Sequence, residues 1–335
     1  MDVVIVNQDE VRQLLAMAEC IEVMKEALEA LARGHAVQPL RTITWLPDRS
    51  GALGLMPGHL DRPSVLGVKV VTVFPENLNT EYESHQGSVL LFDAEKGCLR
   101  ALVDAGEVTR IRTAAVSAVA TRLLARQDAS DLAILGSGAQ AGSHLEAMLL
   151  VRRIERVRVW SRNLEHAQIF ARQASQQHPI DVEPVAQAAD AARNADIICT
   201  TTGAREPVLL GEWVSPGAHI NAVGACFPAA RELDSSAVMK SRLYVDRRES
   251  AMAEAGDFLI PKSRGEIGDD HVRGELGEAL MGRVQGRSSP DDITLFKSLG
   301  LAVEDLAASH HTYAKAIRQG VGTNVPIGGL RHEAT

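Results

Sequence analysis

The stretch Asp131 to Gly142, DLAILGSGAQAG, constrains the fold of this chain more than any other part of the sequence. Its apolar residues from Leu132 to Leu135 predict a buried strand that runs into a glycine turn and then a helix. Gly136, Gly138 and Ala141 have the spacing of the dinucleotide fingerprint G-x-G-x-x-G/A. In that fingerprint the first glycine permits a tight turn, the second admits a pyrophosphate, and the small third residue lets the helix pack against the strand. The helix start then presents backbone N–H groups and the positive end of its dipole to the phosphates.

The flanking sequence supports the fingerprint, which by itself would equally suit an ordinary glycine turn. A second apolar strand, Val157 to Trp160, follows a helical segment that includes His144 to Leu150, so the strand–helix–strand unit is complete. Further predicted strands, separated by alanine-rich helical stretches, are Ile180 to Val182, Asp196 to Thr200, Ala218 to Val223 and Leu243 to Val245. This alternation predicts an α/β domain with a doubly wound parallel sheet of the Rossmann type.

The residues after the second strand bear on which dinucleotide binds. NAD-selective proteins usually place Asp or Glu there to bond the ribose 2′-hydroxyl, whereas NADP sites use Arg for the 2′-phosphate. This chain has Ser161, Arg162 and Asn163. We therefore predict NADPH as the cofactor, with Arg162 on the 2′-phosphate, Ser161 and Asn163 as neutral donors, and NADH as the alternative. Two other interpretations stay open: Arg162 as a solvated loop residue, and Glu165 as a ribose ligand if the strand ends later.

Two short segments, Thr200 to Thr202 and Asn221 to Gly224, fall at the carboxyl ends of predicted strands. Ligands of this fold bind at that edge of the sheet. We therefore expect several of these residues to contact the cofactor.

Residues 40–103 have a different pattern, in which short strands are separated by turns. The predicted strands are Arg41 to Leu46, Ala52 to Met56, Val65 to Val73, Gly87 to Asp93 and Leu99 to Asp104. Turn sequences such as PDRSG and DAEKG lie in this region. An amphipathic helix or helix pair is predicted between Val11 and Leu31. Together these elements predict an α+β domain built on a mostly antiparallel sheet.

Lys69 is anomalous within the strand Val65 to Val73, because apolar residues occupy both faces of that strand. Burial of an unpaired ammonium is costly, so this lysine is expected to meet an anion or to have a lowered pKa. The alternative is a stem packed in the sheet with its head group in water. Arg41 and Arg112 stand at the start of a strand and of a small-residue helix. Either guanidinium suits a carboxylate or phosphate ligand, and either equally suits a surface salt bridge.

Composition excludes several classes of protein. A chain of 335 residues with 45% hydrophobic and 23% charged residues is long enough for two cores. Its net charge of −8 argues against a general nucleic-acid binder. We expect no membrane association, since no stretch is apolar enough to span a bilayer. Four widely separated cysteines match neither a zinc spacing nor a small disulfide framework, which predicts a reducing, cytoplasmic location.

The C-terminal part of the chain is predicted to return to the sheet domain. Thr294 to Gly300 is typical of a strand and turn, and a long helix follows from about Leu301 to Gln319. His310 and His311 are adjacent in that helix and therefore lie on different faces. Neither has a second ligand at metal spacing, so we predict no metal site.

Motifs spread over nearly the whole chain resemble those of the ornithine cyclodeaminase and mu-crystallin family. The matching stretches are Gln38–Thr42, Leu55–Pro57, Gly67–Lys69, Ser84–Gln86, Arg112–Ala118, GSGAQA at 136–141, Gly211–Val214, Pro216–Gly224, Arg231–Asp234, Tyr244–Asp246 and Phe296–Asp305. The resemblance implies a substrate-binding sheet domain that forms a homodimer, for which we expect residues 1–112 and 308–335. It also implies a Rossmann domain, for which we expect residues 113–307.

The resemblance assigns roles to particular residues. It implies that Arg41, Lys69 and Arg112 hold the carboxylate and imine region of the substrate beside the nicotinamide. His85 matches the active-site histidine of the mu-crystallin-like branch, and Cys226 would be a wall of the substrate site. The residues expected to bind cofactor, from the fingerprint and the resemblance together, are Gly136, Gly138, Ala139, Gln140, Ser161, Arg162, Asn163, Thr201, Val223, Gly224, Ser298 and Leu299.

Two departures from the family pattern decide between its branches. Cyclodeaminases resembled by this chain have an aspartate where it has Cys226, and a glutamate where it has Gly54. Without these carboxylates the site lacks the acid and base groups needed for ammonia loss and ring closure. The resemblance therefore implies a ketimine reductase that acts on cyclic imino acids such as Δ1-pyrroline-2-carboxylate and Δ1-piperideine-2-carboxylate. The alternatives are an ornithine or lysine cyclodeaminase, an amino-acid dehydrogenase, and a crystallin-like protein that binds NADPH and a small molecule without turnover.

Overall fold

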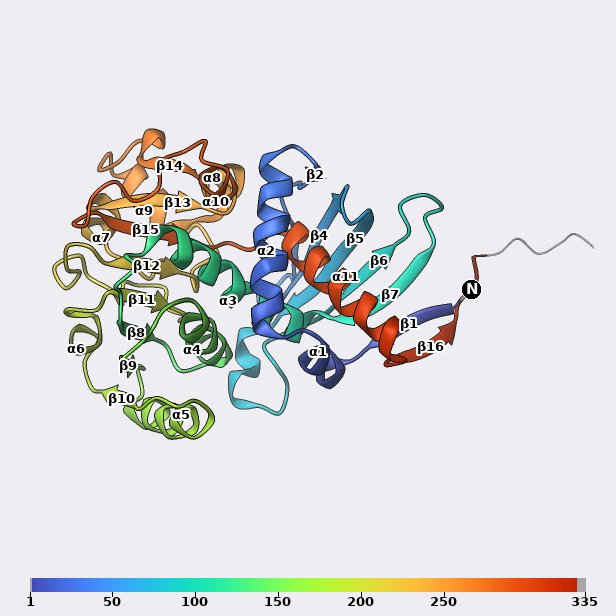
Figure 1. Cartoon of the computed structure of the whole chain (residues 1–335), viewed down its shortest axis with the longest axis horizontal. Helices are drawn as coiled ribbons and strands as arrows, with labels where there is room; N and C mark the ends of the chain where they lie inside the picture. The colour runs from blue at the N-terminus through green and yellow to red at the C-terminus, as the bar shows by residue number, and fades with distance from the viewer. Residues whose placement is uncertain (1, 330–335) are drawn as a thin grey trace, which may run out of the picture. The chain divides into compact units, whose positions relative to one another are not determined.

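The computed structural model describes residues 2–329, which divide into two compact units. Within the described residues, unit 1 comprises residues 2–112 and 301–329, and unit 2 comprises residues 113–300. Each unit is built on its own eight-stranded sheet (Figure 1). The predicted combination of a Rossmann-type parallel sheet and a second, mostly antiparallel sheet is confirmed.

The sheet of unit 1 has the strand order β16-β1-β7-β6-β5-β4-β2, and β3 pairs with β4. Its strands are β1 (Asp2–Val6), β2 (Ala36–Val37), β3 (Thr42–Trp45), β4 (Ala52–Leu60), β5 (Val65–Val73), β6 (His85–Phe92), β7 (Leu99–Asp104) and β16 (Thr323–Pro326). Only β1 and β7 pair in parallel among these described strands. The last strand, β16, pairs with β1, so the C-terminal segment returns to this sheet as predicted.

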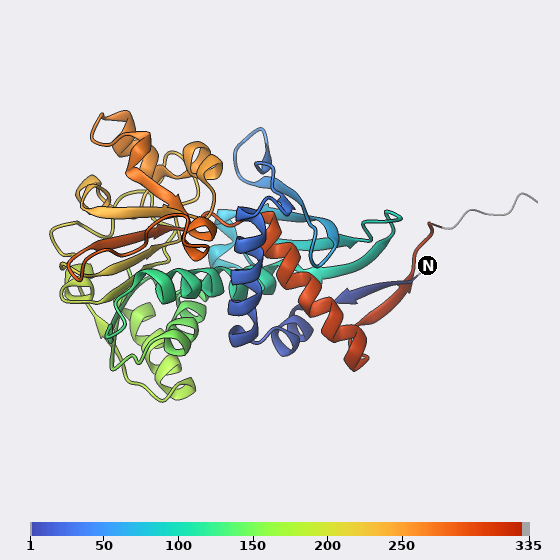
Figure 2. The ribbon, with the colours of Figure 1, turned by 45° about the horizontal axis from the view of Figure 1, so that its top comes forward.

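One face of this sheet is covered by helix α11 (Ala302–Gln319), which lies beside α2 (Met17–Ala32) in both Figure 1 and Figure 2. The predicted helix pair is α1 (Gln8–Leu14) followed by α2, and a short 3-10 helix, Pro75–Asn79, precedes β6. Asn7 caps α1, because its side chain accepts a hydrogen bond from the Glu10 N–H. The chain then turns at residues 15–16, so α1 and α2 are separate helices. Each packs its own apolar face into the unit.

The strand register decides which side chains of the sheet are buried. Met56 of β4 pairs with Lys69 of β5, and Lys69 pairs with Val89 of β6. Paired residues of neighbouring strands share a face, and all three are buried. Lys69 therefore stands among the core residues of unit 1 and does not reach water along the opposite face.

The sheet of unit 2 is parallel throughout its described pairs, with the order β10-β9-β8-β11-β12-β15-β13-β14. Its strands are β8 (Asp131–Leu135), β9 (Arg156–Trp160), β10 (Val182–Val185), β11 (Ile197–Thr200), β12 (His219–Ala222), β13 (Ser241–Val245), β14 (Val272–Glu275) and β15 (Ile293–Lys297). Its helices are α4 (Ala139–Val151), α5 (Leu164–Gln177), α6 (Ala188–Ala192), α7 (Ser235–Met239), α8 (Arg248–Glu254), α9 (Gly256–Ser263), the 3-10 helix Asp269–His271 and α10 (Leu276–Leu280).

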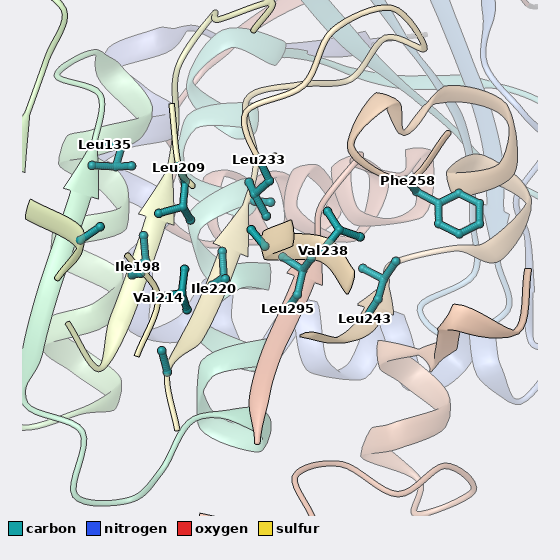
Figure 3. Packing of buried hydrophobic residues seen from close by; sticks show 14 of the residues in the cluster. Leu135, Ile198, Leu209, Val214, Ile220, Leu233, Val238, Leu243, Phe258 and Leu295 are labelled. Atoms are coloured by element: carbon teal, nitrogen blue, oxygen red, sulfur yellow. The ribbon is translucent and has the colours of Figure 1, made fainter. Parts of the chain in front are cut away.

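The core of unit 2 is formed by side chains from neighbouring strands and from the segments that cover them. Figure 3 shows Ile198, Ile220 and Leu295 from β11, β12 and β15, with Leu209 and Leu233 from the connecting segments. All of these side chains are almost fully inaccessible to solvent. A continuous apolar layer on a parallel sheet is what positions the carboxyl ends of the strands rigidly.

Two strands of unit 2 differ from the sequence prediction. The strand predicted at Ile180 to Val182 is wrong in its bounds, since β10 covers Val182–Val185 and pairs with β9. Pro184 lies inside β10, which is tolerated because β10 is the edge strand of the sheet. The strand β14 has no counterpart in the prediction, because its four residues are rich in charge and glycine.

The division between the units also differs from the expected domain boundary. The boundary expected between residues 307 and 308 falls inside α11, whereas the chain divides between Gly300 and Leu301. Gly300 has a φ of 78°, so the chain turns there after β15. The whole of α11 then packs as one helix on the sheet of unit 1. At the other division, between Arg112 and Thr113, helix α3 (Ala105–Leu124) is continuous.

Candidate active site

Lys69 lies on the buried face of unit 1 with two hydrogen-bond partners from other elements. Its Nζ donates to Thr109 Oγ1 of α3 at 2.6 Å and to Asp305 Oδ1 of α11 at 3.2 Å. Thr109 can accept this bond because its own hydroxyl donates to the Ala105 carbonyl. Burial lowers the pKa of Lys69 to about 8, although Asp305 opposes this shift. The alternative of a head group in water is therefore wrong, since Lys69 is 4% exposed.

Arg112 shares the same acidic partner. Its Nε donates to Asp305 Oδ1 at 2.7 Å and its Nη1 donates to Glu304 Oε2 at 2.9 Å. Arg112, Glu304 and Asp305 are all buried, so Arg112 is not a surface salt-bridge residue. Asp305 thus joins Lys69 and Arg112 through one carboxylate oxygen, and this holds both cations in fixed positions.

Arg41 and His85 lie close enough to Lys69 for their charges to interact with it. Arg41 directly precedes β3 and is half-buried, and its positive charge lowers the pKa of Lys69. His85 opens β6 opposite Val73, and therefore shares a sheet face with Lys69 four residues away on β5. Desolvation and the Lys69 charge both lower the pKa of His85, although this residue is exposed at the strand end. Its Nδ1 is 3.1 Å from Ser84 Oγ.

The sequence prediction missed the two carboxylates of this cluster. Glu304 and Asp305 end the matched stretch FKSLGLAVED, but no role was predicted for them. Both are buried in a helix that is apolar on its inner side. Acidic residues within an apolar run are the same signal that singled out Lys69, and buried charges of opposite sign are expected to pair.

In unit 2, the glycine turn has the geometry that the fingerprint predicts. Gly136 has a φ of 125°, and a Cβ built there would lie 2.6 Å from Thr201 Oγ1. Gly138 is the N-cap of α4, and a Cβ built there would meet no atom within 4 Å. The first glycine is therefore required by the fold itself, whereas the second leaves open space before the helix start. Ala139 and Gln140 form the first turn of α4, where backbone N–H groups suit phosphates.

The segment after β9 also lies where predicted. The strand ends at Trp160, so the later strand end that would favour Glu165 as a ribose ligand is not observed. Ser161 Oγ is 3.0 Å from Ser137 Oγ of the glycine turn. Asn163 caps α5, because its Oδ1 accepts from the Glu165 N–H at 2.9 Å. Arg162 is exposed between them.

The other predicted cofactor residues meet at the carboxyl ends of β11, β12 and β15. Thr201 follows β11, and its N–H donates to the Leu135 carbonyl at 2.8 Å. Val223 and Gly224 follow β12, and Ser298 and Leu299 follow β15. Parallel pairing brings these chain segments to one edge of the sheet.

Cys226 lies close to this edge and is half-buried, with its Sγ 3.5 Å from the Val223 carbonyl. None of the four cysteines, all within residues 2–329, takes part in a disulfide. Glu232 lies fully buried beneath the same edge of the sheet, and the sequence prediction gave it no role. The stretch RELD matched the family but carried no local signal for burial.

These residues fit a pyridine dinucleotide. Open space at Gly138, the uncapped start of α4 and the polar strand ends supply the phosphate and ring environments that such a cofactor needs. Among residues 2–329, no cluster of His, Cys, Asp and Glu has the arrangement of a metal site. Within that same range, no helix is long and apolar enough to cross a bilayer.

Comparisons with known proteins agree with this site. Residues 1–320 match the model of the ornithine cyclodeaminase/mu-crystallin family. The ketimine reductase mu-crystallin of Mus musculus is 43% identical over 280 residues, which cover 84% of this chain and 85% of that protein.

Solved structures are also similar over nearly the whole chain. The Δ1-pyrroline-2-carboxylate reductase of Thermococcus litoralis, in complex with NADH and L-proline, is 40% identical with a TM-score of 0.94 and covers 96% of this chain and 100% of its own. An archaeal alanine dehydrogenase dimer with bound NAD is 33% identical with a TM-score of 0.92 and covers 98% of this chain and 100% of its own.

Proposed function

Since this chain belongs to the ornithine cyclodeaminase/mu-crystallin family, we propose that it is an NAD(P)H-dependent reductase of cyclic 2-imino acids. Its substrates would be ketimines such as Δ1-pyrroline-2-carboxylate and Δ1-piperideine-2-carboxylate, and its products proline and pipecolate. The observation that carries this proposal is the buried group of cations in unit 1, formed by Lys69 and Arg112 with Arg41 beside them. The relatives named a ketimine reductase and a Δ1-pyrroline-2-carboxylate reductase support the same reaction.

The cations of unit 1 are suited to an anionic substrate. Lys69 and Arg112 are buried, and the positive charge of the half-buried Arg41 acts on Lys69 from beside them. Ammonium and guanidinium groups in such surroundings bind a carboxylate through charge-assisted hydrogen bonds. Two of the three N–H donors of Lys69 are used by Thr109 and Asp305, which leaves the third for the ligand.

Imine reduction requires an oriented substrate, a hydride and a proton on nitrogen. When bound, the reduced dinucleotide supplies the hydride that becomes the new C–H bond at the imine carbon. The arginines would hold the carboxylate and thereby fix the orientation of the C=N group, which supplies much of the rate. His85 or a water molecule would provide the proton to nitrogen. Desolvation and the Lys69 charge lower the pKa of His85, which disfavours the protonated form that would act as the donor.

The two departures from the cyclodeaminase pattern support reduction over ammonia loss. Gly54 is buried on β4, and its closest side-chain neighbour is Val71 of β5. Cys226 offers a thiol in place of a carboxylate and contacts the Val223 carbonyl. With no acidic side chain at either position, the amine protons of ornithine would have no base assigned to them.

We propose NADPH as the preferred cofactor, with NADH as a second substrate. The exposed guanidinium of Arg162 lies directly after β9, where a 2′-phosphate binds in proteins of this fold. Ser161 and Asn163 flank it with neutral polar groups, and Asn163 is also the cap of α5. The relative from Thermococcus litoralis was solved with NADH, so the preference has to be measured for this chain.

We also propose a homodimer formed through the outer face of the unit 1 sheet. Leu53, Leu55 and Leu66 lie on the face opposite Lys69 and are each more than a third exposed. An apolar sheet face of this kind is typical of an interface. The related alanine dehydrogenase is described as a dimer. The four cysteines outside any disulfide suit the cytoplasmic location predicted from the sequence, which stays a prediction.

The direct experiment is to follow NADPH oxidation by absorbance with Δ1-pyrroline-2-carboxylate and Δ1-piperideine-2-carboxylate as substrates. We expect turnover with at least one of them and formation of proline or pipecolate. No turnover with either ring size would overturn the proposal. Ammonia release from ornithine with catalytic amounts of NAD would instead establish a cyclodeaminase, and tight NADPH binding without any turnover would establish a binding protein.

A further inference from the structure

Three charged side chains are buried together in unit 2, beneath the carboxyl ends of β11, β12 and β15. Glu232, Asp257 and Lys297 are 0%, 2% and 1% exposed. Lys297 Nζ lies 3.1 Å from Asp257 Oδ2 and donates to the Ala222 carbonyl at 3.3 Å. Asp257 Oδ1 accepts the N–H groups of Glu232 and Leu233 at 2.8 and 2.9 Å. Lys297 is paired with Asp257, and its charge also acts on Glu232, so the group carries one net negative charge when all three are ionised.

The hydrogen bonds of Glu232 show which form of its carboxyl the structure accommodates. Its Oε1 accepts from the N–H and the hydroxyl of Thr202 at 2.6 and 2.7 Å. Its Oε2 accepts from the Thr200 hydroxyl at 2.8 Å and from the Gly224 N–H at 2.6 Å. A backbone N–H can only donate, and each carboxylate oxygen has one such donor, so the arrangement suits the ionised form. Burial and the nearby charge of Asp257 raise the pKa of Glu232, while Lys297 and the hydrogen bonds from Thr202 act against that shift.

Glu232 lies one hydrogen bond behind the residues expected to meet the cofactor. Gly224 is one of these residues, and Thr202 directly follows another, Thr201. The side chain thus joins the segment after β11 to the segment after β12. Its hydrogen bonds are used by these two segments, so any effect on a ligand would be exerted without direct contact.

We propose that Glu232, supported by Asp257 and Lys297, is a positioning residue that makes the dinucleotide site prefer the oxidised cofactor over the reduced one. The inference rests on the proposed function, and it places the nicotinamide ring at these strand ends, where Thr201, Val223 and Gly224 are expected to meet the cofactor. That ring gains one positive charge when it loses a hydride. A buried negative charge attracts the charged ring and acts far less on the neutral one, because the surroundings have a low dielectric constant. The same attraction would stabilise the positive charge that develops during hydride transfer.

The test is the ratio of two dissociation constants, measured on the full-length protein without imine. NADPH binding is followed by its fluorescence and NADP⁺ binding by calorimetry, and the pair NADH and NAD⁺ is measured in the same way. In Glu232→Gln the ratio of the oxidised to the reduced dissociation constant should rise about tenfold, because the net negative charge is lost while the volume is kept. In Glu232→Asp, which keeps the charge but shortens the reach, both constants should rise together and the ratio should change less than about twofold.

A second variant guards against misfolding. Asp257→Asn also removes one negative charge and should raise the ratio in the same direction, so it replaces Glu232→Gln if circular dichroism shows that variant to be unfolded. Equal weakening of oxidised and reduced cofactor in the folded charge-removing variant would overturn the inference and leave Glu232 a structural tie. Failure of the protein to reduce imines would not affect this readout, because no imine is present.

Discussion

Unit 1 brings charged side chains together at its proposed substrate site, whereas unit 2 presents backbone groups at its proposed cofactor site. In unit 1, Lys69, Arg112 and Asp305 come from a strand and two helices, and both cations donate to the one buried carboxylate of Asp305. In unit 2, Gly136 and Gly138 open a helix start, and parallel strands end beside it. The cluster in unit 1 depends on the charge of particular side chains, and the turn in unit 2 depends on the absence of side chains. Substitutions should therefore fail in different ways in the two units.

The largest effect is expected from Lys69→Met. The variant keeps the length of the stem but removes the ammonium, so the substrate carboxylate and imine lose a buried donor. We expect kcat/KM for the imine to fall about a thousandfold, as when a preorganised donor is removed from an active site. The dissociation constant of NADPH should be unchanged, because the cofactor residues belong to unit 2.

Lys96→Met provides the matched control, since Lys96 is exposed in the turn between β6 and β7. Its kcat/KM should equal that of the unchanged protein. A loss of less than about tenfold in Lys69→Met would show that the ammonium contributes little to the reaction, and would weaken the contrast between the two units.

The second-largest effects are expected when alanine replaces either of the two glycines of the turn, Gly136 or Gly138. Gly136→Ala should destabilise the protein by about 3 kcal/mol, because a φ of 125° is strained for alanine and its Cβ would lie 2.6 Å from Thr201 Oγ1. Gly138→Ala should leave the free energy of unfolding almost unchanged, since its φ is −86° and its Cβ would meet no atom. Instead it should raise the dissociation constant of NADPH by about a hundredfold, because the methyl group would occupy the approach to the pyrophosphate.

Urea unfolding and fluorescence titration measure the two effects separately. Each variant is the control for the other, because both add one methyl group to the same turn. If Gly138→Ala bound NADPH as tightly as the unchanged protein, the phosphates would have to lie elsewhere.

The contrast between the units also explains what the sequence could and could not predict. The fingerprint of unit 2 is local, since Gly136, Gly138 and the strand before them are adjacent in the chain. Lys69 was recognised because a charge within an apolar strand is anomalous by itself. Its partner Asp305 was not, because 236 residues separate the two and nothing local indicates which charges will pair. The same holds for Glu232, which contacts backbone groups of other segments.

The bounds predicted for some strands and for the two units were wrong for a related reason. The residues of α11 repeat with a helical period, but periodicity does not say on which sheet a helix packs, and so the expected division at residue 308 was wrong. The edge strand β14 was missed because its pairing with β13, and not its own composition, makes it a strand. Tertiary contacts decided both cases.

A smaller effect is expected at the proposed 2′-phosphate site. Arg162→Asp should lower the ratio of kcat/KM for NADPH over NADH by about thirtyfold, because a charge-assisted hydrogen bond is replaced by repulsion. Arg172→Asp makes the same charge change at an exposed position of α5 and should leave the ratio unaltered. An unchanged ratio in Arg162→Asp would assign the guanidinium to solvent and would leave cofactor selectivity in unit 2 to backbone shape alone.

The smallest effect concerns the pH dependence that the charge cluster of unit 1 should impose. The pKa of Lys69 is lowered from 10.5 to about 8, so kcat/KM should fall as the pH rises through that value and the ammonium is lost. Between pH 8 and 10.5 the unfolded chain binds more protons at this site than the native one, so the contribution of Lys69 to stability rises with pH there.

The variant Asp305→Asn tests this assignment. It removes the carboxylate that opposes the lowering of the Lys69 pKa, and should move the alkaline limb of the profile of kcat/KM against pH down by about one pH unit. Asp181→Asn, at an exposed position of unit 2, should leave the alkaline limb of the kcat/KM profile in place. The titration of the imine itself is the same for all variants and therefore cannot shift the limb in one of them. A limb that stays fixed in Asp305→Asn would mean that Lys69 does not limit the reaction, and that the cluster serves substrate binding through its arginines.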